Sequence, residues 1–95
     1  MSIKKRGSRQ PELFPRSMSP TIFRDGSLRF YFFSREEPRI HVHVKSPDGE
    51  AKFWMEPTIE LAQNFGLTAR QVKAALKSIQ EHEDEIREAW AVHFS

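Results

Sequence analysis

The chain has 95 residues, no cysteine and a net charge of +2. This length suits one small domain with a single hydrophobic core. Without cysteine, the chain has no disulfide bond, no thiolate metal site and no cysteine nucleophile. No apolar run approaches the ~20 residues that a membrane-spanning helix needs, and the first basic residues are not followed by the apolar core of a signal peptide. We therefore expect a soluble, cytoplasmic protein.

The charge is unevenly distributed along the chain. Residues 1–20 contain five basic side chains (Lys4, Lys5, Arg6, Arg9 and Arg16) and one acidic side chain, Glu12. The rest of the chain contains ten basic and twelve acidic residues. A basic segment with proline and serine and few apolar residues is typical of disorder, although it can also contact nucleic-acid phosphates or acidic partners. We expect residues 1–19 to be a disordered basic tail and residues 20–95 to be a single α+β domain.

Two β-hairpins are predicted in the first half of this domain. The strands 21–24 and 28–33 are joined at Asp25-Gly26, a pair typical of tight hairpin turns. The strands 40–45 and 51–55 are joined by Ser46-Pro47-Asp48-Gly49, with proline and glycine where a type I turn prefers them. These patterns predict a four-stranded antiparallel sheet.

Two helices are expected after the hairpins. Thr58 is a candidate cap for a short helix that ends at Phe65 and stops at Gly66, with four apolar residues available for burial: Ile59, Leu61, Ala62 and Phe65. Thr68 and Gln71 have the spacing of a capping box, which predicts the start of the last helix. One apolar stripe follows on that helix: Val72, Leu76, Ile79, Ile86, Trp90 and Phe94. We expect both helices to cover one face of the sheet.

Glu83 falls in the middle of this apolar stripe. A carboxylate there needs an ion-pair partner if the helix packs along its full length, so a buried ion pair is one interpretation. The alternative is that the last turns extend beyond the sheet and leave Glu83 in solvent. His82 and His93 lie beside the stripe and are ~16 Å apart along the axis, too far to bind one ion together.

Alternation along the strands divides the sheet residues into two faces. The face expected under the helices is apolar: Phe23, Leu28, Phe30, Phe32, Ile40, Val42, Val44, Phe53 and Met55. The opposite face, called the outer face below, is both basic and aromatic: Arg29, Tyr31, Phe33, His41, His43, Lys45, Lys52 and Trp54. Such a surface is typical of a homodimer or protein-partner interface, because Tyr, Trp, Phe and Arg are enriched there. It also suits single-stranded RNA, whose bases stack on aromatic rings while cations hold phosphates.

His41 and His43 alternate with Val42 and Val44, so both imidazoles are expected on the outer face. One hypothesis is a divalent-metal site completed by Glu50 or Glu56 from the neighbouring strand. Another is that either histidine acts as a general base in RNA cleavage. We expect neither a stoichiometric metal nor any other cofactor, because no further ligand is well placed and no nucleophile accompanies the pair.

Six sequence blocks between Pro20 and Phe94 form a specific combination. They are Pro20 to Gly26, Arg29 to Phe32, His41 to Val44, Gly49 to Trp54, Glu56-Pro57, and Glu85 through Trp90 to Phe94. Together they resemble the bacterial domain-of-unknown-function family 4160. The resemblance implies no established reaction. Members of the family that this chain resembles are often encoded beside another small protein, which suggests a toxin–antitoxin-like role. Family members tend to open with Met-Pro-Thr-Ile, so Met18, just before Ser19-Pro20-Thr21-Ile22, is a candidate native start.

The sequence therefore predicts a small cytoplasmic protein that binds a partner through its outer face. The expected partner is the small protein encoded by the adjacent gene, or a second copy of the chain. The alternative functions are an RNA-binding or RNA-cleaving toxin that uses His41 and His43, and a divalent-metal-binding domain. No membrane association is expected.

Overall fold

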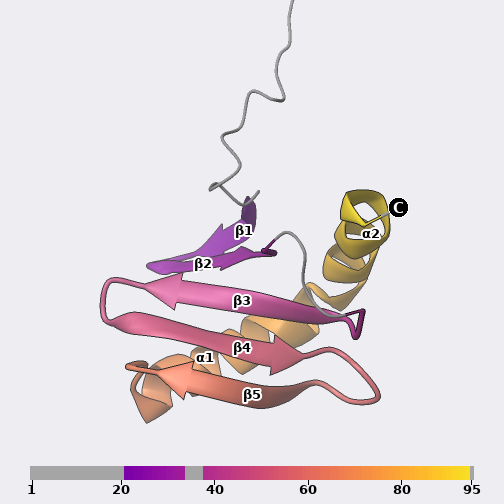
Figure 1. Ribbon diagram of the computed structural model, residues 1–95. Coiled ribbons are helices and arrows are strands. Elements are labelled where there is room, and N and C mark those ends of the chain that lie inside the picture. Colours follow the sequence, from indigo (N-terminus) through magenta and orange to yellow (C-terminus); the bar gives the residue numbers. More distant parts are fainter. Residues whose placement is uncertain (1–20, 34–37, 95) are drawn as a thin grey trace, which may run out of the picture.

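Five antiparallel strands and two helices make up residues 21–33 and 38–94, the part of the chain that the computed structural model describes (Figure 1). The strands are β1 (Thr21–Asp25), β2 (Leu28–Tyr31), β3 (His41–Ser46), β4 (Gly49–Trp54) and β5 (Glu60–Phe65). The helices are α1 (Ala69–Glu81) and α2 (Glu83–His93). The predicted tail, residues 1–19 with Met18, lies outside the described residues. The α+β class, the antiparallel sheet and a pair of C-terminal helices agree with the sequence analysis.

The strands form a single meander in the order β1-β2-β3-β4-β5, and both predicted hairpins are confirmed. The first turn comprises Gly26 and Ser27, one residue later than the predicted Asp25-Gly26 pair, because Asp25 still pairs with Leu28. Gly26 has a φ of 61°, which is costly for residues with a side chain. In the second hairpin Ser46 pairs with Gly49, so Pro47 and Asp48 form the turn. The Ser46 hydroxyl accepts a hydrogen bond from the Asp48 amide at 3.1 Å, which stabilises this turn.

The sheet has five strands, so the prediction of four strands and of a helix ending at Phe65 is wrong. Residues 60–65 form β5, which pairs with β4 from Glu50↔Phe65 to Trp54↔Glu60. An eight-residue helix gains few internal hydrogen bonds, whereas the same residues as a strand satisfy the open edge of β4. Tertiary pairing therefore overrides the local helical pattern here.

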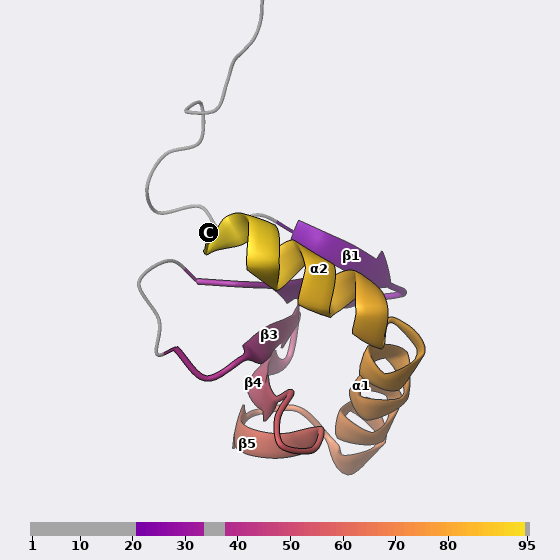
Figure 2. The same cartoon turned by 90° about the vertical axis from the view of Figure 1, so that its right-hand side faces the viewer.

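The predicted capping box is confirmed at the start of α1. The Thr68 hydroxyl accepts from the Gln71 amide at 3.1 Å, and the Gln71 side chain accepts from the Thr68 amide at 2.9 Å. The single long helix expected after it is interrupted at His82, whose φ of −114° and ψ of 23° lie outside the helical range. The chain changes direction there, so α1 and α2 cover different parts of the sheet (Figure 2). None of the described helices is both long and apolar enough to span a membrane.

The hydrophobic core lies between the sheet and these two helices (Figure 2). The predicted inner face is confirmed: seven of its nine residues are buried, and Phe23 and Ile40 pack against them half-buried. The helices contribute buried Ala75, Ile79 and Ile86, with Val72, Leu76, Trp90 and Phe94 packed at the margin. Because one face is fully used by the helices, the opposite face remains as the surface of the sheet.

Candidate functional site

The outer face brings together all of the residues that the alternation predicted for it. Cross-strand pairing sets Arg29 opposite Lys45, Tyr31 opposite His43, and His43 opposite Lys52. His41 stands opposite Trp54 in the same register. Phe33 follows β2 and its ring lies 4.5 Å from that of His43. Helix α1 lies behind the opposite face of the sheet, and α2 crosses the end of the sheet near His41 (Figures 1 and 2). In residues 21–33 and 38–94, the part of the outer face around His43, Lys45 and Lys52 is not covered by either helix.

Tyr31 forms the floor of the outer face rather than an exposed part of it, with only 3% of its surface exposed. The Arg29 guanidinium lies 4.6 Å from the ring centroid, and the His43 ring stacks on Tyr31 at 5.4 Å. The Tyr31 hydroxyl donates a hydrogen bond to the Glu50 carboxylate at 3.1 Å. Phe33 approaches the same ring edge-on at 5.4 Å. These contacts fix the central ring of the outer face and leave little of it for a ligand.

Trp54 holds two cations at the other end of the face. The Arg39 guanidinium lies 3.9 Å and the Lys52 ammonium 4.4 Å from its ring centroid. Arg39 is also tied to the neighbouring loop, because its Nε donates to the carbonyl oxygen of Glu56 at 2.9 Å. Contacts between cations and the indole face are each worth about 0.5–1 kcal/mol near the surface. Trp54 therefore serves as a support that orders positive charge on the outer face.

His41 is completely buried, so the expectation that both imidazoles stand exposed is wrong for this residue. Its Nδ1 donates to the carbonyl oxygen of Arg39 at 2.6 Å, which requires the proton on Nδ1 because a carbonyl only accepts. Trp90 of α2 and Trp54 pack edge-on against it, with ring centroids at 5.1 and 5.7 Å. Alternation along β3 correctly placed His41 on the same face as Trp54, but the indole of Trp90 covers its ring at this end of the strand. A ligand on the outer face can reach His43 but not the ring of His41.

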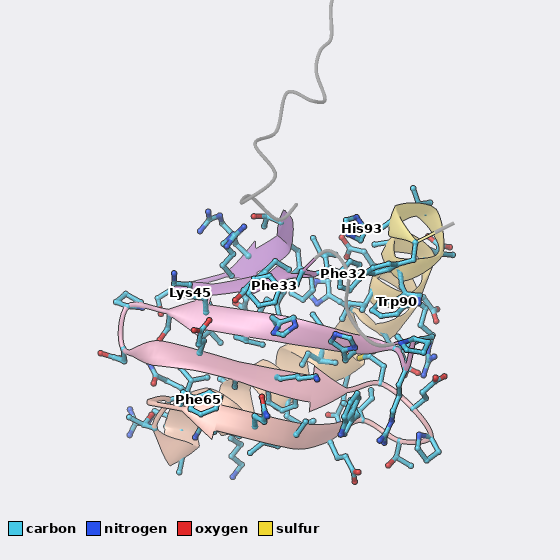
Figure 3. The ribbon with its side chains drawn as sticks, viewed as in Figure 1. Phe32, Phe33, Lys45, Phe65, Trp90 and His93 are labelled. Atoms are coloured by element: carbon cyan, nitrogen blue, oxygen red, sulfur yellow. The ribbon has the colours of Figure 1, made fainter. Side chains whose placement is uncertain are left out.

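His43 lies at the centre of the face and is half-buried. It lines a shallow hollow of about 130 Å³ with six other residues: Phe33, Glu50, Ala51, Lys52, Gln63 and Phe65. Phe33 and Phe65 are 41% and 64% exposed, and both project from the outer face (Figure 3). Lys45, another predicted member, is exposed on the same face (Figure 3). The accessible part of the outer face is therefore a hollow lined by two apolar rings and by the polar side chains of His43, Glu50, Lys52 and Gln63.

Three members of this hollow were not predicted: Ala51, Gln63 and Phe65. Phe65 was expected to be buried on a helix, but as part of β5 it shares the parity of Gln63 and lies on the outer face. The signal in the sequence is the spacing of Gln63 and Phe65, which is as compatible with a strand as with a helix. Glu50 was expected near the histidines only as a possible metal ligand, and it shares the parity of Lys52 and Trp54 on β4.

Glu83 forms an ion pair with Arg87, one helical turn later. The Arg87 Nε and Glu83 Oε2 atoms are 3.0 Å apart, and their side chains are 36% and 41% exposed. The Glu83 carboxylate is thus neither buried in the core nor fully in solvent, the two environments considered for it in the sequence analysis. Such a pair contributes less than about 1 kcal/mol. Arg87 also donates from Nη2 to the Met55 carbonyl at 2.7 Å, so its main role is to attach α2 to the sheet.

The proposed metal ligands are not gathered into one site. No cluster of three or more His, Asp or Glu side chains suited to a metal ion occurs in residues 21–33 and 38–94. Glu50 is bonded to the Tyr31 hydroxyl, and Glu56 accepts from the Ile40 amide at 3.4 Å. His41 uses Nδ1 for the Arg39 carbonyl. The described ligand types therefore do not support the divalent-metal hypothesis.

The fold and the open, aromatic and cationic sheet face define a small α+β domain with one candidate binding surface. The family model of a domain of unknown function (DUF4160) matches residues 27–91, a span that contains all eight predicted outer-face residues. The chain belongs to this family. Neither a curated protein nor a solved structure is significantly similar to it.

Proposed function

We propose that the chain is the partner-binding component of a toxin–antitoxin-like two-gene module in the bacterial cytoplasm. In this proposal it binds the small protein encoded by the adjacent gene through the outer face. The observation that carries the proposal is the pair of exposed rings, Phe33 and Phe65, on the part of the outer face away from the Trp90 contact. Contiguous apolar surface with a polar rim is typical of protein interfaces.

The construction of the face also supports a preformed interface. Tyr31, His43 and Trp54 are held by ring stacking, cation contacts and hydrogen bonds across three adjacent strands. A surface that is already ordered loses little side-chain entropy when a partner binds. The outer face can therefore bind with the structure that it has in the free domain.

Single-stranded RNA is the alternative ligand, but the state of the rings favours a protein. RNA readers stack bases on exposed aromatic faces. Here Tyr31 is buried between Arg29 and His43, and two cations lie over Trp54. Among the described aromatic residues of the outer face, only Phe33 and Phe65 expose more than a third of their surface. A general-base role in RNA cleavage would fall to His43, since His41 is buried.

The proposal is tested by co-expression with the adjacent gene and affinity measurement on the purified pair. Phe33→Ser and Phe65→Ser should each weaken the complex about 30-fold, which corresponds to a hot-spot loss of ~2 kcal/mol. The matched control is Val92→Ser, because Val92 is 78% exposed but lies on α2. It should leave the affinity within about twofold of the wild-type value.

Three outcomes would contradict the proposal. The first is that the two gene products do not associate. The second is that the Val92 variant loses as much affinity as the two phenylalanine variants. The third is RNA cleavage or growth arrest on expression that His43→Ala abolishes, which would establish the RNA-directed alternative.

A further inference from the structure

We infer that the partner inserts a large apolar side chain into the hollow between Phe33 and Phe65 and surrounds it with carboxylates. This inference rests on the proposed function and specifies the chemistry of the partner segment. It combines the charge of the outer face with the size and lining of the hollow.

The outer face is strongly positive when all of its described charges are considered. Its basic side chains are Arg24, Arg29, Arg39, Lys45 and Lys52, and its acidic side chains are Glu50 and Glu60. Glu50 already accepts a hydrogen bond from the Tyr31 hydroxyl, and five basic side chains still exceed the two acidic ones. Interfaces pair potentials of opposite sign, since like charges brought together cost several kcal/mol. A segment bound here must therefore present an excess of acidic groups.

The two helices carry excess charge of opposite sign. Helix α2 carries Glu83, Asp84, Glu85 and Glu88 against a single arginine, Arg87. An acidic partner is therefore attracted to the outer face and repelled by α2. Helix α1 also carries an excess of basic side chains, Arg70, Lys73 and Lys77 against Glu81, so the exposed rings and the hollow distinguish the outer face from α1.

The hollow indicates what lies among these carboxylates. Its volume of about 130 Å³ is well below that of a typical small-molecule site, so it suits a single inserted side chain. The rings of Phe33 and Phe65 stand at its rim, and Lys52, Gln63 and Glu50 provide polar groups around it. Interface hot spots are typically side chains that fill a pocket on the partner and are surrounded by contacts that exclude water.

Charge reversal on the full-length protein separates this inference from the proposed function. We would measure the affinity for the purified product of the adjacent gene at low and high salt. The double variant Lys45→Glu with Lys52→Glu should bind at least about tenfold more weakly and lose most of its salt dependence. Lys73→Glu with Lys77→Glu, on the exposed side of α1, is the matched control and should change the affinity less than about twofold. Because Lys52 contacts Trp54, Lys45→Glu alone and a thermal melt of each variant report on folding.

A photocrosslinker identifies the partner segment directly. With Phe65→p-benzoylphenylalanine, irradiation of the complex and mass spectrometry should recover a partner peptide with net negative charge and a leucine, isoleucine, methionine or phenylalanine at the linked position. A linked peptide that is basic or lacks an apolar residue would overturn the inference, and so would a linked RNA. If the phenylalanine variants abolish binding but the lysine variants do not, the inference fails while the proposed function stands. If the wild-type pair forms no complex, both fail.

Discussion

Replacing His41 with alanine should destabilise the domain far more than the same change at His43. The imidazole of His41 is fully buried and donates to the Arg39 carbonyl at 2.6 Å. Removing it leaves that carbonyl without its donor, at a cost of about 1–3 kcal/mol. It also leaves a cavity beside Trp54 and Trp90, which adds about 2 kcal/mol. We expect a total loss on the order of 4 kcal/mol for His41→Ala and about 1 kcal/mol for half-buried His43→Ala.

Urea denaturation followed by tryptophan fluorescence measures this difference, since both tryptophans flank His41. A loss of 4 kcal/mol corresponds to a fall in Tm of roughly 15 °C or more for a domain of this size. His41→Gln keeps an N–H donor and should recover part of the stability. Equal losses for the two alanine variants, or no recovery with glutamine, would refute the assignment of His41 as a structural support.

Three further predictions concern the turn at Gly49, the N-terminal segment and the metal content. Gly49→Ala would place a Cβ in collision with the Phe65 carbonyl oxygen, so we expect a loss on the order of 3 kcal/mol by chemical denaturation, against ~1 kcal/mol for Gly26→Ala in the open first turn. A smaller loss at Gly49 would mean that β5 shifts easily. Deletion of residues 1–17 should leave the Tm within a few degrees, as measured by calorimetry, because this segment offers little apolar surface to bury. Elemental analysis of untagged protein should find well under one metal ion per chain. About one ion that disappears when His41 and His43 are both replaced by glutamine would restore the metal-site hypothesis.

The sequence predicted those parts of the fold whose signals are local. Alternation assigned the inner face of β2, β3 and β4, and the turn residues located both hairpins. The spacing of Thr68 and Gln71 located the start of α1. Each of these signals involves residues that also interact with each other in the folded chain.

The errors occur where distant segments decide the structure. Strand β5 has one open edge and a register irregularity near Ala62, so its apolar residues do not alternate cleanly. The burial of His41 depends on Trp90, which the chain brings back only after the break at His82. That break is stabilised by the His82 ring, which stacks on Phe23 at 4.0 Å and donates from Nδ1 to the Ser78 carbonyl. No periodicity within the helix contains this information.

The contrast between local signals and contacts of distant segments also explains why only part of the candidate site was predicted. The eight outer-face residues followed from strand parity, which is a property of each strand alone. Which of them remain accessible depends on neighbours from other elements. The hollow depends on Phe65, and Phe65 belongs to the outer face only because β5 exists.

The two hairpin turns differ in how they would accept extra chain. The turn at Pro47 and Asp48 is exposed but attached to the rest of the domain, because Asp48 accepts from the Gln71 side chain at 2.9 Å and its carbonyl lies against Gly66. An insertion there would separate the sheet from the first turn of α1. A Cβ added at Gly26 would meet nothing within 4 Å. The Gly26-Ser27 turn is consequently the place in the described domain for a fluorescent label, an epitope or a fused reporter that leaves the outer face undisturbed.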